Sequence, residues 1–123
     1  MGKLSYIVVT ALLSMLLFGC GSDQDKIVIN YCKALDAEKL DEAASYLSKD
    51  ARQVLERAGG KSLLAEAGNK FKQHKGISSI KITKKKVAGE RANVEFVYNF
   101  NDGSTYADYF PLVKEDGKWK ISK

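Results

Sequence analysis

The sequence predicts an α+β domain in which short N-terminal helices pack on a strongly curved, four-stranded antiparallel sheet. Three observations support this fold class. Apolar residues recur at helical spacing in the first half of the chain, apolar and polar residues alternate in the second half, and glycine-containing turns separate the alternating segments. A chain of 123 residues, 45% of them hydrophobic, is long enough for one domain with one core.

The N-terminal segment that precedes this domain has the composition of an export signal. Lys3 provides a positive start, and residues 4–18 form an uninterrupted apolar or weakly polar stretch. The segment ends in Leu17-Phe18-Gly19-Cys20, which resembles the lipobox of bacterial lipoproteins. The resemblance implies that the Cys20 thiol receives a diacylglycerol and that the chain is cut before this residue. An uncleaved N-terminal membrane helix is the alternative interpretation.

The lipobox resemblance divides the chain and gives it a location. We expect a signal peptide at 1–19, a lipidated cysteine with a short tether at 20–26, and the folded domain at 27–123. Two or three acyl chains such as palmitate, at ~0.8 kcal/mol per buried methylene, anchor a protein to the membrane of the bacterial envelope. Gly21 is not the aspartate that holds many lipoproteins at the inner membrane, which slightly favours the outer membrane, facing the periplasm.

The second of the two cysteines is expected to be a buried thiol. With Cys20 committed to lipid, Cys32 has no intramolecular disulfide partner. Val28, Tyr31, Cys32 and Leu35 follow the spacing of one apolar helix face. The alternative, a catalytic nucleophile, is less favoured on such a face.

The positive charge of the chain does not indicate a nucleic-acid partner. The formal net charge is +5, and it falls to +4 when Lys3 leaves with the signal. Lys81, Lys84, Lys85 and Lys86 form the densest basic cluster, which has no interleaved aromatic residues. We interpret this cluster as a solvated strand end beside a hairpin, with weak attraction to anionic lipid headgroups as the alternative.

Four short helices are expected before the sheet. Asp25 is expected to cap the first, which runs to about Ala37. The third begins after Ser48 and stops at Gly59-Gly60, and the fourth is closed by Gly76. The apolar stripes of the last three helices are Leu40, Ala43, Ala44 and Leu47; Ala51, Val54, Leu55 and Ala58; and Leu64, Ala67 and Phe71.

Four strands follow, and each is joined to the next by a tight turn. Turns are expected at 88–90, 101–103 and 115–117, the last two around Asp-Gly pairs that suit hairpins. Pro111 interrupts the third strand and predicts an edge position, a bulge or a bend, because proline lacks the ladder donor. The alternating apolar residues are Ile80 and Ile82 in the first strand, and Ala92, Val94, Phe96, Tyr98 and Phe100 in the second.

Three segments together resemble a known group of proteins. They are Tyr31-Cys32-Lys33-Ala34-Leu35, Gly76-Ile77-Ser78-Ser79-Ile80 and the C-terminal Asp116-Gly117-Lys118-Trp119-Lys120-Ile121. Together with the acylated cysteine, they resemble bacterial lipoprotein domains of unknown function near the lumazine-binding-like proteins, in the nuclear transport factor 2-like superfamily. The resemblance implies a cone-shaped fold with a cavity between the sheet and the helices. It implies no reaction, because this fold has many functions.

Aromatic side chains and one carboxylate are the candidate ligand-binding residues. Tyr31 and Tyr98 are the first candidates to line the cavity, because a tyrosine hydroxyl needs a hydrogen-bond partner or water. Phe96, Phe110 and Asp108 complete the candidate set. Asp108 shares its strand alternation with Phe110, and an outward position near the rim of the sheet is favoured over an inward one.

The residues give little support for catalysis. His74 lies among cations at a helix end, where a capping or surface role is expected. No metal-ligand spacing, glycine-rich phosphate loop or nucleophile–base pair is present in the sequence, so no cofactor or metal is expected.

We therefore expect a membrane-anchored, non-catalytic module that binds a small amphipathic ligand or an envelope protein. The alternatives are an isomerase- or hydratase-like enzyme that uses Asp108 and a tyrosine, and a structural envelope protein that forms a homodimer.

Overall fold

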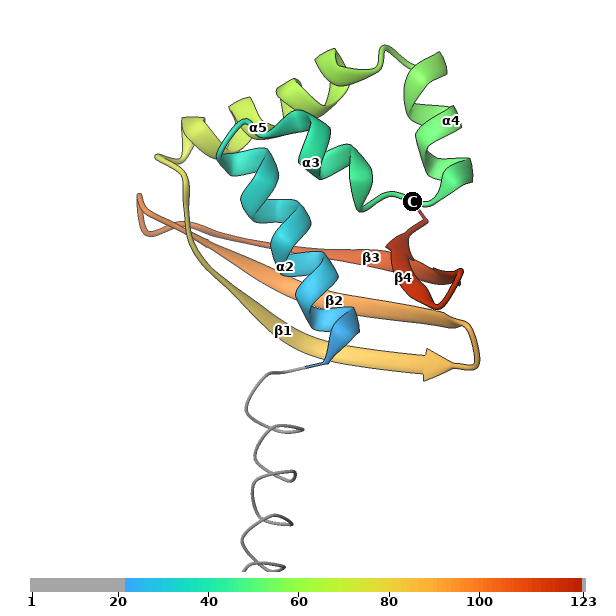
Figure 1. Cartoon of the computed structure of the whole chain (residues 1–123). Coiled ribbons are helices and arrows are strands. Elements are labelled where there is room, and N and C mark those ends of the chain that lie inside the picture. Colours follow the sequence, from blue (N-terminus) through green and yellow to red (C-terminus); the bar gives the residue numbers. More distant parts are fainter. Residues whose placement is uncertain (1–21, 123) are drawn as a thin grey trace, which may run out of the picture.

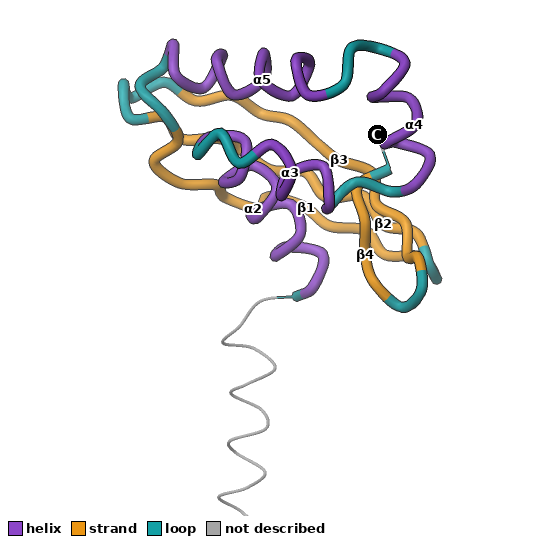
Figure 2. Tube along the Cα trace, turned by 45° about the horizontal axis from the view of Figure 1, so that its top comes forward, coloured by secondary structure: helices purple, strands orange, loops and turns teal. Residues whose placement is uncertain are grey.

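The helices lie together over one face of a curved sheet in the computed structural model, which describes residues 22–122 (Figures 1 and 2). The expected signal peptide and Cys20 lie outside the described residues. No helix within the described part is long and apolar enough to cross a membrane. In chain order the elements are α2 (Asp23–Asp36), α3 (Leu40–Ser45), α4 (Lys49–Arg57), α5 (Lys61–Gln73), β1 (Ile77–Ala88), β2 (Arg91–Phe100), β3 (Thr105–Glu115) and β4 (Lys118–Ile121).

Helix α2 begins earlier than the sequence predicted. Ser22, and not Asp25, is the N-cap, because the Ser22 side chain accepts a hydrogen bond from the Asp25 backbone nitrogen at 3.1 Å. Asp23 and Asp25 instead occupy the first turn, where the helix dipole favours negative charge. Residues 23–26, expected to be part of a tether, are therefore helical.

The N-terminal end of α2 is fastened to the sheet. The Lys85 ammonium of β1 donates a hydrogen bond to Ser22 Oγ at 2.7 Å and lies 3.3 Å from Asp25 Oδ1. Both charged side chains of the ion pair are mostly shielded from solvent, with 30% and 24% of their surfaces exposed. These contacts join the first described residues to β1.

The four strands form one antiparallel sheet in the order β1-β2-β3-β4. All three predicted turns are confirmed, and Gly103, Asp116 and Gly117 have the positive φ angles that tight turns require. The register of β1 against β2 shifts twice, at Ile77/Ser79 and at Ile82/Lys84. Such irregularities bend a strand, and they accompany the curvature of β1 in Figure 1.

Pro111 lies in β3, which is an inner strand between β2 and β4, at the point where β4 ends. Its carbonyl oxygen accepts hydrogen bonds from the backbone nitrogen and the hydroxyl of Ser122, the residue directly after β4. In an antiparallel strand the nitrogen and oxygen of one residue face the same neighbour. The missing N–H of Pro111 therefore faces the end of β4, and the ladder between β3 and β2 remains continuous.

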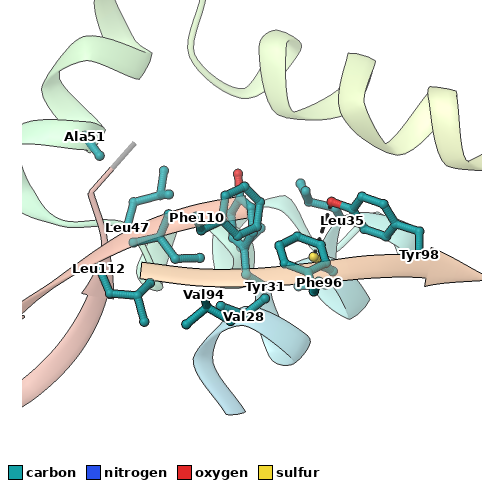
Figure 3. Packing of buried hydrophobic residues seen from close by; sticks show 14 of the residues in the cluster. Val28, Tyr31, Leu35, Leu47, Ala51, Val94, Phe96, Tyr98, Phe110 and Leu112 are labelled. Atoms are coloured by element: carbon teal, nitrogen blue, oxygen red, sulfur yellow. Dashed lines mark hydrogen bonds between the residues drawn. The ribbon is translucent and has the colours of Figure 1, made fainter. Parts of the chain in front are cut away.

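The core lies between α2 and the concave face of the sheet. The predicted stripe of α2 is confirmed, since Val28 and Cys32 have no exposed surface and Leu35 is buried. These residues pack with Phe96, Leu112 and other apolar residues of the strands (Figure 3). The predicted stripe of the third helix is only partly correct. Val54 is 60% exposed, because α4 extends beyond the edge of the core and buries only Ala51.

Helix α5 crosses α2 in close contact at a glycine. A Cβ atom on Gly68 would lie 2.7 Å from the Leu35 carbonyl oxygen, which is closer than real Cβ contacts allow. The absence of a side chain at Gly68 therefore lets α5 lie close to α2. This placement positions α5 above the sheet, where it forms one wall of the cleft described next.

Candidate ligand-binding cleft

A cleft of about 730 Å³ lies between α5 and the concave face of β2 and β3. Helix α2 contributes Tyr31 and Leu35 to its lining, and α5 contributes the apolar side chains of Leu63, Ala67 and Phe71. The cleft shows that the helices do not fill the space above the sheet. Cavities of this size are typical of small-molecule sites.

Stacked aromatic rings form the wall of the cleft on β2 and β3. The Tyr98 ring is nearly parallel to the rings of Phe100 and Tyr106, with centroid distances of 5.6 and 6.3 Å. Phe71 approaches Tyr98 from α5 with a centroid distance of 5.0 Å. Flat ring faces arranged in this way suit an apolar or planar ligand.

The structure brings four of the five predicted site residues into this cleft. Tyr31, Tyr98, Phe110 and Asp108 all line it. Phe96 does not, because its ring is 1% exposed and packs between Tyr98 and Phe110 at centroid distances of 5.0 and 5.1 Å. Figure 3 shows Phe96 within the core cluster. Phe96 therefore supports the cleft from below.

A buried thiol lies beneath the tyrosine hydroxyls. Cys32 Sγ donates a hydrogen bond to Tyr98 Oη over 3.6 Å (dashed line in Figure 3). The pKa of the Cys32 thiol is raised to about 12, mainly by burial; the hydrogen bond with Tyr98 lowers it, and the Asp108 charge adds to the rise. Cys32 is therefore protonated at neutral pH. It also has no exposed surface, in agreement with the expectation of a buried thiol.

The two predicted tyrosines are neutral hydrogen-bonding groups. Burial raises the pKa of Tyr31 to about 12, and the neighbouring Cys32 adds to this shift. Burial is also the largest cause of the raised pKa of Tyr98, followed by the effects of Cys32 and Asp108. Each hydroxyl can donate or accept a hydrogen bond but carries no charge at neutral pH.

Asp108 points to the concave face, so the favoured outward position was wrong. It lies opposite Phe96 in the β2–β3 register and shares the alternation of Phe110. The Asp108 charge contributes to the raised pKa values of Cys32 and Tyr98. Asp108 Oδ1 also accepts a hydrogen bond from the Tyr109 backbone nitrogen at 2.8 Å. The half-buried carboxylate gives the cleft an acidic side chain.

His74 lies at the mouth of the cleft, where it forms the C-cap of α5 as expected. Its ring stacks on Phe100 at a centroid distance of 4.7 Å. His74 Nδ1 lies 3.0 Å from Asp102 Oδ2 and 3.1 Å from Ser104 Oγ. Hydrogen bonds from Ser104, and to a lesser extent the contact with His74, lower the pKa of Asp102 to about 2.

The histidine, serine and aspartate do not form a catalytic triad. In a triad the serine and the aspartate contact different ring nitrogens, whereas here Ser104 and Asp102 both contact His74 Nδ1. The cluster instead joins the β2–β3 turn to the end of α5, where the Asp102 backbone nitrogen also donates to the His74 carbonyl. Sequence reasoning missed this position of His74, because the contact joins segments about thirty residues apart.

The described residues offer no grouping of three or more histidine, cysteine, aspartate or glutamate side chains that could hold a metal ion. The chemical groups gathered in the cleft are therefore aromatic faces, neutral hydroxyls and a few charged side chains. Lys70 and Glu66 of α5 line the cleft in addition to Asp108. This arrangement can enclose an apolar body and make hydrogen bonds to a polar end.

Comparisons with solved structures identify the fold. A Campylobacter jejuni protein provisionally named an NTF2-like transpeptidase (NTF2, nuclear transport factor 2) has a TM-score of 0.70 and 21% identity, covering 83% of this chain and 99% of that one. A designed NTF2 fold protein, NT-9, has a TM-score of 0.52 and 22% identity, covering 84% and 85%. A SEC-C motif containing protein from Rhodopseudomonas palustris has a TM-score of 0.54 and 14% identity, covering 74% and 68%.

These similarities confirm the predicted NTF2-like α+β fold. At such low identity they show the fold and nothing of the activity. No curated protein matches the sequence. The profile of a family described as a domain of unknown function, DUF4878, matches residues 18–122. The chain therefore belongs to the DUF4878 family and has an NTF2-like fold.

Proposed function

We propose that the protein is a lipid-anchored lipoprotein of the bacterial envelope, whose domain binds a small amphipathic ligand without transforming it. The observation that supports binding is the open cleft of about 730 Å³. A purely structural, dimerising protein has no need of an open cleft. The anchor is proposed from the lipobox that ends at Cys20, and the outer membrane remains the favoured location.

The lining of the cleft supports an amphipathic ligand. Stacked rings around Tyr98 provide an apolar surface. The Tyr31 and Tyr98 hydroxyls and the Asp108 carboxylate provide a few polar contacts that can orient one end of the ligand. A segment of an envelope protein with an aromatic or aliphatic anchor side chain would use the same chemistry, and is the second kind of partner that we consider.

We do not propose transpeptidase activity, which the name of the Campylobacter jejuni protein contains, for this chain. A transpeptidase that forms a covalent intermediate needs an exposed, activated nucleophile. Cys32, the free thiol of the described residues, is fully buried and has a raised pKa. Ser104 contacts His74 and Asp102 in an arrangement that does not place a base between serine and carboxylate.

The binding proposal is tested by native mass spectrometry of the protein extracted from cells. We expect a co-purifying small molecule or peptide of defined mass. Ala67→Phe should remove it, because Ala67 lines the cleft and a phenyl ring there would occupy the site. Asn69→Phe is the matched control, since Asn69 is exposed on the same helix and does not line the cleft. Equal ligand retention by both variants would contradict binding in the cleft.

One observation favours an enzyme as the second candidate. Asp108 and Tyr98 both line the cleft, and isomerases and hydratases use a carboxylate base together with a hydroxyl donor. Asp108→Asn keeps the shape of the side chain and removes its basicity. For a binding module we expect the bound molecule to be chemically unchanged after long incubation with either protein. Conversion by the unmodified protein that stops in Asp108→Asn would support the enzyme instead.

A further inference from the structure

A second groove, of about 390 Å³, lies between the start of α2 and β4 and shares no lining residue with the cleft. Its charged lining residues are three lysines, Lys26, Lys118 and Lys120, and one acid, Asp23. The groove is therefore predominantly basic. Ile27 and the largely buried Trp119 add apolar surface to its lining.

The two lysines of β4 line this groove together with residues of α2. Trp119 and Ile121 point into the core, so Lys118 and Lys120 point away from it. Lys120 Nζ donates a hydrogen bond to the Ser45 carbonyl at 2.8 Å, which holds its ammonium at the wall of the groove. Within residues 22–122, neither Lys26 nor Lys118 has an acidic partner within 4.0 Å.

The groove lies beside the point where the chain enters the domain. Asp23 and Lys26 belong to the first turn of α2 and line the groove. Ser22, directly before this helix, is held on β1 by Lys85. Cys20 is two residues earlier, and two residues of extended chain span at most ~7 Å. If Cys20 is acylated, as proposed above, the start of α2 lies at the level of the lipid head groups.

We propose that this groove docks the tethered domain on its membrane by receiving the phosphate groups of anionic phospholipids. The three ammonium groups supply positive charge that Asp23 offsets only in part, and a phosphate diester supplies the complementary charge. A membrane is favoured over a soluble phosphate ester because the tether holds this groove beside the lipid surface. Docking there leaves the ligand-binding cleft, which is lined by other residues, free for its ligand.

Hydrogen–deuterium exchange of the acylated protein that begins at Cys20, purified from cells and reconstituted in vesicles, tests this proposal. One vesicle preparation contains phosphatidylcholine alone, and the other contains phosphatidylcholine with phosphatidylglycerol. We expect slower exchange in the first turns of α2 and in β4 only with phosphatidylglycerol. The double variant Lys26→Gln/Lys118→Gln should lower the ratio of docked to undocked protein about 25-fold, at about fivefold per lysine.

The matched control is Arg52→Gln/Arg57→Gln, which removes the same charge from exposed positions on α4. This control variant should still show slower exchange in the first turns of α2 and in β4 with phosphatidylglycerol. Equal exchange in both vesicles, or unchanged protection in Lys26→Gln/Lys118→Gln, would overturn docking. Equal protection by dissolved glycerol phosphate would also overturn it, in favour of a soluble phosphate ester. Failure of the anchor gives a different result, because the protein would then lack acyl mass and would not associate with phosphatidylcholine vesicles.

Discussion

Phe96→Ala is expected to lower the free energy of unfolding by about 3–5 kcal/mol, because it leaves a cavity in the centre of the core. The Phe96 ring is 1% exposed and contacts the rings of Tyr98 and Phe110. A loss of this size is a large part of the 5–15 kcal/mol that stabilises a typical domain. Urea unfolding monitored by circular dichroism measures this loss. We expect a lower urea concentration at the midpoint and an unchanged dependence of the unfolding free energy on urea concentration.

The matched control for this prediction is Tyr106→Ala on β3. Tyr106 is also aromatic but 61% exposed, so its removal should change the free energy of unfolding by about 0.5 kcal/mol or less. Phe96→Leu keeps most of the volume and should retain the ligand of the cleft, since Phe96 does not line it. Similar losses in Phe96→Ala and Tyr106→Ala would show that Phe96 is not the centre of the core.

Cys20→Ser is expected to abolish both lipid attachment and removal of residues 1–19. A serine hydroxyl is a much weaker nucleophile than a thiolate and cannot accept the diacylglycerol. Mass spectrometry of the protein purified from cells should find a chain that begins at Cys20 and carries acyl mass. In Cys20→Ser it should find residues 1–19 still attached and no acyl mass. Labelled palmitate should enter only the unmodified protein.

The other cysteine provides the control for lipid attachment. Cys32 is buried in the core, so Cys32→Ser should still incorporate labelled palmitate. Retention of residues 1–19 in the unmodified protein, without acyl mass, would support the alternative of an uncleaved membrane helix. That result would contradict both the proposed lipid anchor and the proposed position of the basic groove beside the lipid.

The order and types of the elements could be predicted because each has a local cause. Glycine-containing turns separate the strands, and Ser48 caps α4 through a hydrogen bond from the Ala51 backbone nitrogen. The start of α2 was misplaced because Ser22 and Asp25 are both good N-caps, and local sequence does not distinguish them. Val54 was misassigned because helical spacing identifies an apolar face without showing whether another element covers it.

The cleft was predicted less completely, because its shape depends on contacts between distant segments. Alternation places Phe96 and Tyr98 on the same face of β2. It cannot show that Phe96 lies beneath other rings while Tyr98 lines the cleft. Asp108 was assigned outward because a buried carboxylate is costly, but the open cleft leaves it half-buried. The position of His74 depends on the β2–β3 turn, which no local pattern reveals.

Within the described residues, β1 is an outer strand of the sheet, and its outer edge has no partner strand. If the protein is lipid-anchored as proposed, its copies share a thin layer and collide more often than dissolved ones, and an outer strand edge without a partner strand can pair with that of a neighbouring copy. The lysines at 81, 84 and 86 are exposed along this strand. Like charges on approaching copies repel one another, so the outer edge of β1 can stay without a partner strand even where the protein is crowded.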